Sequence, residues 1–198
     1  MSYKDFTLED LRDKFGIHFQ HKKLFENTQL IEPTNLLKQI LARSNSFSLT
    51  TEKAKSEAIV FPILAEIMER NKKSISVFSG EILNADRKAG LSGECDFLIT
   101  KDPEIPRLTV PIISVIEAKK SDMDSGVDQC AAQLVGIRVF NEKKLKFLDS
   151  IYGCVTNAND WKFLKLQNNI ITIDTDTYFI KDLPLILGAF QTIIDNCK

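Results

Sequence analysis

The residues Ile113-Ser114-Val115-Ile116-Glu117-Ala118-Lys119-Lys120 join an apolar, β-branched run directly to a charged end. The run begins at Val110, and its composition predicts a central strand that is buried on both faces. Side chains two residues apart in a strand lie on the same face, so we expect Glu117 and Lys119 to point the same way and Ala118 the opposite way. The stretch therefore predicts a core strand that ends in a polar site.

A second apolar stretch with acids at one end, Gly93-Glu94-Cys95-Asp96-Phe97-Leu98-Ile99, precedes this strand. Asp96 stands 21 positions before Glu117 (117 minus 96), which suits a β-hairpin or a strand followed by a long turn. If the two strands are neighbours, two carboxylates lie side by side and repel, and a hard divalent cation such as Mg²⁺ or Mn²⁺ removes that repulsion. The alternative is a pair of solvated strand ends, because a Glu-x-Lys match by itself is weak.

Periodicity along the rest of the chain alternates between helical and extended. Helices are predicted over residues 7–16, 33–42, 51–71, 124–144 and 182–196. Strands are predicted over residues 74–83, 94–100, 110–118, 152–156, 161–166 and 170–174, and polar or proline-containing loops over residues 44–51 and 101–107. Pro62 predicts a kink or break in its helix, and Gly80 a bulge or bend in its strand.

This order of elements predicts an α/β fold with α+β-like character, in which helices flank a mixed central sheet. The 198 residues fit a single domain, with residues 1–50 as a helical N-terminal extension. His18 and His21 stand in a polar stretch that is read as irregular surface, with no third metal ligand at suitable spacing.

Composition limits the environment and the partners. With 26 basic and 27 acidic residues, the net charge is -1. Binding to nucleic acid would therefore depend on local clusters of basic side chains. We also expect a homodimer or a protein partner to contribute part of the DNA-binding surface. The four cysteines are scattered, which favours reduced thiols and a cytoplasmic location. No apolar run approaches the length of a membrane span, so no membrane contact is expected.

Four segments carry polar residues in a recognisable order. Glu57 stands on a predicted helix, Asp96 on a strand, Glu117-Ala118-Lys119 at the end of the next strand and Gln133 on the following helix. This order resembles the PD-(D/E)XK nuclease superfamily, which includes restriction endonucleases, Holliday-junction resolvases and DNA-repair nucleases.

The resemblance is closest to small proteins similar to the nuclease region of type I restriction enzyme motor subunits. It is carried there by a Tyr-Gly-x-x-Thr-Asn-like turn followed by Trp-x-Phe, which in this chain reads Tyr152-Gly153-Cys154-Val155-Thr156-Asn157 and Trp161-Lys162-Phe163. It extends from Thr51 to Leu166 and leaves the first fifty residues unexplained. It implies a restriction-endonuclease-like fold.

The resemblance also implies roles for the residues of the motif. Asp96 and Glu117 would be the metal ligands, and the backbone carbonyl of Ala118 could supply a third oxygen. Lys119 would position the attacking water. The cofactor would be Mg²⁺ or Mn²⁺.

Two residues from helices complete the implied site. Glu57 would reach it either directly or through a metal-bound water, and Gln133 would orient Lys119 or contact the phosphate backbone. The sequence departs from the family pattern at Cys95, where the motif has proline. Because Cys95 is expected to face away from Asp96 in the strand, we interpret it as a buried core thiol.

The expected activity is that of a divalent-metal-dependent nuclease, a hydrolase that cleaves DNA phosphodiester bonds by attack of a metal-activated water. The sequence leaves open DNA or RNA as substrate and endonuclease or exonuclease as the mode of cleavage. The alternative from another class is a catalytically inactive restriction-endonuclease-like module that binds protein or nucleic acid.

Overall fold

The centre of the molecule is an eight-stranded mixed sheet with the order β1-β7-β6-β5-β4-β3-β2, and β8 pairs with β6. The computed structural model describes residues 1–44, 46–103 and 107–197, so residue 45 and residues 104–106 of the two predicted loops lie outside the described part. The strands are β1 (His18–His21), β2 (Ser76–Asp86), β3 (Leu91–Thr100), β4 (Ile112–Ala118), β5 (Ser150–Thr156), β6 (Asp160–Gln167), β7 (Ile170–Ile173) and β8 (Tyr178–Phe179).

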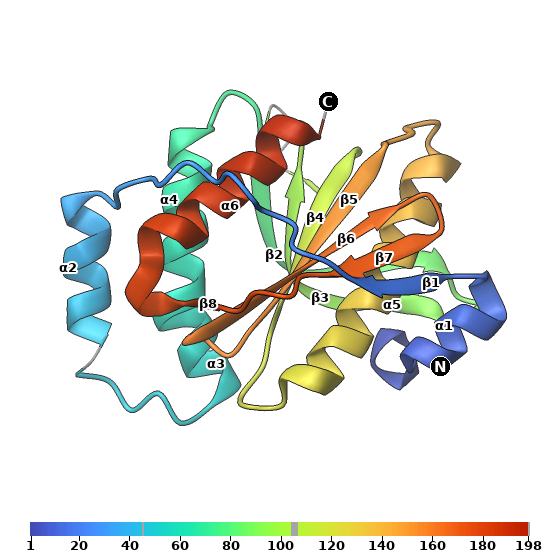
Figure 1. Cartoon of the computed structure of the whole chain (residues 1–198), viewed down its shortest axis with the longest axis horizontal. Coiled ribbons are helices and arrows are strands. Elements are labelled where there is room, and N and C mark those ends of the chain that lie inside the picture. The colour runs from blue at the N-terminus through green and yellow to red at the C-terminus, as the bar shows by residue number, and fades with distance from the viewer. Residues whose placement is uncertain (45, 104–106, 198) are drawn as a thin grey trace.

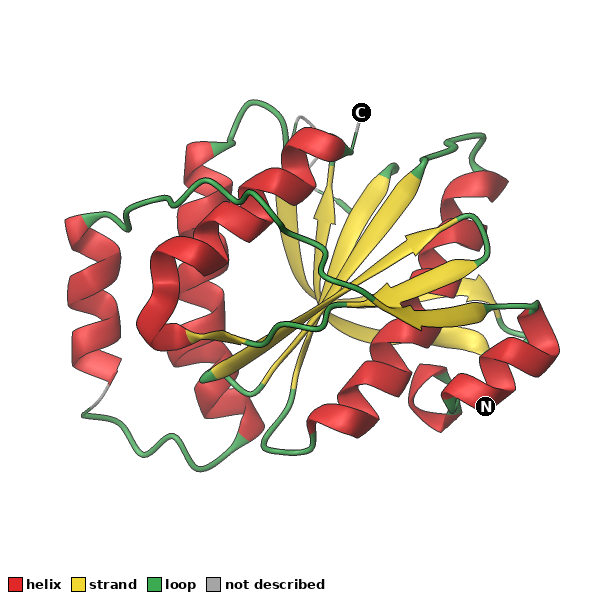
Figure 2. Cartoon of the chain, viewed as in Figure 1, coloured by secondary structure: helices red, strands yellow, loops and turns green. Residues whose placement is uncertain are grey.

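Helices cover both faces of this sheet (Figure 1, Figure 2). They are α1 (Leu8–Phe15), α2 (Asn35–Ser44), α3 (Glu52–Lys55), α4 (Phe61–Arg70), α5 (Met123–Lys143) and α6 (Leu183–Asn196), with short turns η1 (Tyr3–Asp5), η2 (Ser56–Val60) and η3 (Ile180–Asp182). Residues of α4 and α6 share one hydrophobic cluster with the sheet, and residues of α5 share the other. The predicted α/β class, a mixed sheet flanked by helices, is confirmed. None of the described helices is both long and apolar enough to cross a membrane.

Strand β4 occupies the middle of the fold. All of its residues are buried, as its β-branched composition predicts. It pairs antiparallel with β3 and parallel with β5, and α5 makes the crossover that a parallel pair requires. The end of β4 is therefore fixed from three sides, by two neighbouring strands and by one helix.

The first fifty residues differ from the predicted helical extension. Helices α1 and α2 are present, but His18–His21 forms strand β1, which pairs in parallel with β7 at the edge of the sheet. Gly16 ends α1 with a φ of 64°, as the sequence predicts, but the prediction of an irregular segment after it was wrong, because pairing with β7 holds these residues extended. Earlier in the first fifty residues, Tyr3 and Leu11 are buried in the core beneath α5.

The predicted break at Pro62 is confirmed. Helix α3 passes through the π-helical turn η2 into α4, and Pro62 lies in the first turn of α4. Proline has no N–H to donate to the carbonyl of Ala58, four residues earlier, and that carbonyl accepts a hydrogen bond from the Ser44 hydroxyl at 2.7 Å instead. In β2, Gly80 has a φ of 69°, but the register shift lies between Asn84 and Asp86. The bulge therefore lies further along the strand than the sequence indicated.

Tyr3 and Gly136 form a close contact that fixes the N-terminal turn to α5. A Cβ added at Gly136 would lie 2.3 Å from the Tyr3 hydroxyl. We expect Gly136→Ala to lower the free energy of unfolding by about 1–3 kcal/mol through overpacking. In a double-mutant cycle followed by urea denaturation, Gly136→Ala should cost much less when Tyr3 is already alanine. Equal costs in the two backgrounds would contradict this contact.

Candidate active site

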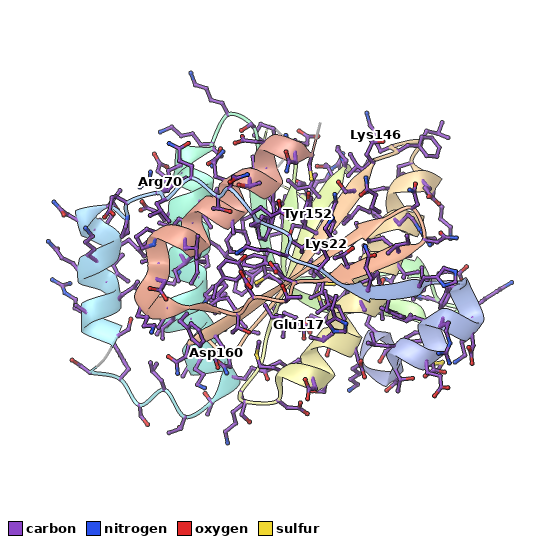
Figure 3. All side chains as sticks on the ribbon, in the orientation of Figure 1. Lys22, Arg70, Glu117, Lys146, Tyr152 and Asp160 are labelled. Carbon is purple, nitrogen blue, oxygen red and sulfur yellow. The ribbon has the colours of Figure 1, made fainter. Side chains whose placement is uncertain are left out.

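A cleft of about 480 Å³ lies where β4 ends against β3 and the first turns of α5. Its lining is mostly polar and comprises Ser2, Tyr3, Lys4, Glu52, Gly93, Glu94, Asp96, Glu117, Lys119 and Gln129. Glu117, labelled in Figure 3, lies between the end of β4 and α5. The cleft thus contains three of the residues singled out from the sequence, namely Asp96, Glu117 and Lys119.

Asp96 is fixed by the backbone of the neighbouring strand. The ladder between β3 and β4 reaches Phe97 and Ile116, and beyond it the Asp96 carboxylate accepts a hydrogen bond from the backbone N–H of Ala118 at 2.7 Å. Burial raises the pKa of Asp96, although this hydrogen bond opposes the shift. The pairing of β3 with β4 therefore places the Asp96 carboxylate, which is harder to ionise than a solvated one, beside the end of β4.

Glu117 is almost fully enclosed, with 3% of its surface exposed. Its Oε1 accepts hydrogen bonds from Lys119 Nζ at 2.8 Å and from Gln129 Nε2 at 2.5 Å. Its Oε2 accepts one from Gln133 Nε2 at 2.7 Å. Burial, together with the charge of Asp96, raises the pKa of Glu117 to about 7. The two carboxylates are thus close enough to oppose each other's ionisation.

Lys119 is the cation that faces these acids. Its ammonium group donates to Glu117 and, at 2.9 Å, to Gln129 Oε1. Burial is the largest single effect and lowers the pKa of Lys119, but the charge and hydrogen bond of Glu117, together with the charges of Glu52 and Asp96, outweigh burial, so the pKa is raised. A Cβ added at Gly126 would lie 3.0 Å from Lys119 Cγ and 2.5 Å from Val155, so glycine lets α5 approach the lysine stem closely. An ammonium has three N–H donors, and these two contacts leave one for a ligand in the cleft.

Gln133 lies where the sequence predicted, on α5 and fully buried. Its amide nitrogen contacts Glu117, while its Oε1 has no hydrogen-bond partner. Contact with Lys119 comes instead from Gln129, one helical turn earlier, which sequence reasoning missed. The i, i+4 spacing of the two glutamines was the available signal, because it places both on one face of a helix.

Glu57 does not line the 480 Å³ cleft. It lies in the turn η2, largely exposed, 3.8 Å from Lys53. It lines an adjoining hollow of about 410 Å³ together with Asp96 and Ala118. The helical acid in the cleft itself is Glu52, whose carboxylate accepts the backbone N–H of Lys120 at 3.1 Å. The role expected for Glu57 therefore stays a prediction.

The donor set suits a hard cation. No three His, Cys, Asp or Glu side chains in residues 1–44, 46–103 and 107–197 form a ready-made metal cluster. Mg²⁺, however, binds through one or two carboxylates and keeps its other positions for water and substrate phosphate. Asp96 and Glu117, each with a raised pKa, form a pair of that kind, and a cation between them would offset their repulsion.

Cys95, His18 and His21 have the burial that the sequence predicts. Cys95 is fully buried in the hydrophobic cluster beneath α5, which confirms the interpretation as a core thiol. His18 and His21 are exposed on the edge strand β1. Neither cysteine nor histidine lines the cleft among the described residues.

Comparison with known proteins adds no relative. No protein-family model matches the chain, and no curated protein matches it.

Proposed function

We propose that this chain is a divalent-metal-dependent nuclease of the PD-(D/E)XK type that hydrolyses phosphodiester bonds in DNA. The observation that carries the proposal is the pair of acids, half-buried Asp96 and buried Glu117, with Lys119 held 2.8 Å from Glu117 in one polar cleft. A phosphodiester carries negative charge that increases in the transition state, and a cation together with a fixed ammonium group would counter that charge. Mg²⁺ or Mn²⁺, bound by the two acids, would polarise the phosphate and favour deprotonation of water.

The reaction is hydrolysis by water, and the side chains of the cleft would orient the reacting groups. Water oxygen forms a bond to phosphorus while the bond from phosphorus to the leaving sugar oxygen breaks, which gives a phosphomonoester and a sugar hydroxyl. Lys119, through its remaining N–H, would orient the water or a phosphate oxygen. Gln129 and Gln133 hold the Glu117 carboxylate in place. They thereby keep Glu117 and Lys119 in a fixed relative position when a substrate binds.

The rival function is a binding module that has lost catalysis. Physical cost argues against it. Two neighbouring acids whose pKa values are both raised destabilise a folded chain at neutral pH, and a module without chemistry could replace either with a neutral residue. The retention of Asp96, Glu117 and Lys119 together therefore favours the enzyme.

The test is incubation of supercoiled plasmid and of single-stranded DNA with the protein in Mg²⁺, Mn²⁺ or EDTA, beside the variant Lys119→Ala. We expect cleavage with either metal, none in EDTA, and loss of cleavage in the variant. RNA of matched sequence identifies the preferred nucleic acid. DNA binding without cleavage in both metals would favour the binding module.

A further inference from the structure

The N-terminal turn forms part of the wall of the same cleft. Ser2, Tyr3 and Lys4 line it together with Asp96, Glu117 and Lys119, although the motif that defines the site begins some fifty residues later. In Figure 1 this turn and α1, at the blue end of the chain, lie beside α5. The proposed chemistry gives these residues no role.

The turn is held rigidly. Tyr3 is 1% exposed, and its hydroxyl donates to the backbone carbonyl of Leu83 at 3.1 Å. Its ring packs against two glycines: an added Cβ would lie 2.3 Å from Tyr3 atoms at Gly136 and 3.1 Å at Gly93. Lys4 therefore projects from a fixed turn, with its backbone anchored at the edge of the cleft.

Lys4 has no acidic partner of its own. It forms no ion pair with any residue that the structure describes, whereas its neighbour Asp5 is engaged by the backbone N–H and the hydroxyl of Ser2. The other lysine of the cleft, Lys119, is committed to Glu117 and Gln129. Of the two lysines in the lining, Lys4 is thus the one that pairs with no acid among the described residues.

The lining of the cleft carries more acidic than basic side chains. Glu52, Glu94, Asp96 and Glu117 line the cleft against only two lysines. A polyanionic backbone entering it meets repulsion from every acid that a metal does not neutralise. A lysine in the same lining offsets part of that repulsion at a phosphate next to the one that is cleaved.

We infer that Lys4 is a substrate-positioning residue that contacts a nucleic-acid phosphate flanking the scissile one, and that the N-terminal turn is a wall of the active site. The inference rests on the proposed function. It assigns to the first residues a direct part in substrate binding, and it specifies the ligand as a phosphodiester backbone rather than a small phosphate ester.

The experiment compares the whole chain with Lys4→Met, Lys4→Arg and, as matched control, Lys146→Met. Lys146 is an exposed lysine that Figure 3 labels far from Glu117. DNA affinity is measured in Ca²⁺ as a function of salt, and cleavage in Mg²⁺ gives kcat and KM. Thermal denaturation of each variant checks that the fold is intact.

We expect Lys4→Met to weaken DNA binding about tenfold and to reduce the slope of log affinity against log salt by about one, as for the loss of one phosphate contact. The loss should appear mainly in KM, Lys4→Arg should restore most of it, and Lys146→Met should behave like the parent. A merely structural role would change the melting temperature and leave the salt slope unaltered.

Two failures can be told apart. If the parent cleaves DNA and Lys4→Met matches Lys146→Met in affinity and salt slope, the inference is overturned and the nuclease stands. If the parent shows neither DNA binding nor metal-dependent cleavage, the proposed function fails and the inference fails with it.

Discussion

Replacing Lys119 with methionine is expected to slow cleavage of DNA in saturating Mg²⁺ by about 10²- to 10⁴-fold. Methionine keeps the apolar stem that packs beneath Gly126 but removes the ammonium that lies 2.8 Å from Glu117 and 2.9 Å from Gln129. The developing charge on the phosphate then loses its fixed donor. Single-turnover kinetics with enzyme in excess measure the chemical step directly.

The control for Lys119→Met must exclude unfolding. Circular dichroism and thermal denaturation should show a folded protein, because the lysine side chain is at the margin of the cleft and 16% exposed. Lys146→Met removes a lysine far from Glu117 (Figure 3) and should retain the parent rate. A rate for Lys119→Met within about threefold of the parent would remove Lys119 from the mechanism.

Replacing Asp96 with asparagine is expected to abolish cleavage, with a loss of about a thousandfold or more, because the cation contributes several kcal/mol to the transition state. Asparagine can still accept the Ala118 N–H through its amide oxygen. The variant should therefore keep the strand geometry and lose one ligand charge.

The same variant should be more stable than the parent in EDTA at pH 8. A carboxyl group whose pKa is raised in the folded state stabilises the fold while protonated, so that contribution is present at low pH and lost as the pH rises through the folded-state pKa. For Glu117 the loss falls between its ordinary value of 4.5 and about 7. Without the Asp96 charge this loss is smaller, so the advantage of Asp96→Asn should shrink as the pH is lowered from 8 to 5.

Mg²⁺ should reverse the order of stability. The parent gains stability by mass action when the folded state binds the ion, about 2.7 kcal/mol at a hundredfold excess over Kd, whereas Asp96→Asn gains much less. Urea denaturation at pH 5 and pH 8, with and without Mg²⁺, measures both effects. A variant that is less stable than the parent in EDTA at pH 8 would contradict the repulsion between the two acids.

Strand β4 could be predicted because its own composition specifies it. Seven buried residues follow one another there, and β-branched side chains favour the extended backbone whatever lies around them. Strand β1 could not be predicted, because His18–His21 has no alternation and becomes a strand by pairing with β7, some 150 residues later. Its extended state comes from a tertiary contact, which local patterns do not encode.

In the candidate site, too, some contacts follow from the local sequence and others only from the tertiary structure. Glu117 and Lys119 are two residues apart on one strand, so their contact at 2.8 Å followed from the period of a strand. The turn around Tyr3 gives no such signal. It reaches the cleft because Gly93 and Gly136 leave room for its ring, and that fit is visible only when three distant segments have been folded together.

The proposed function requires Asp96 and Glu117 to hold a divalent cation. Calorimetric titration of Mn²⁺ into the parent and into Asp96→Asn, in the same buffer at pH 8, tests it most directly. We expect a single site in the parent and an affinity at least about tenfold weaker in the variant, since one of the two carboxylate ligands is lost. Equal affinities in the two proteins, or no binding by the parent, would contradict it.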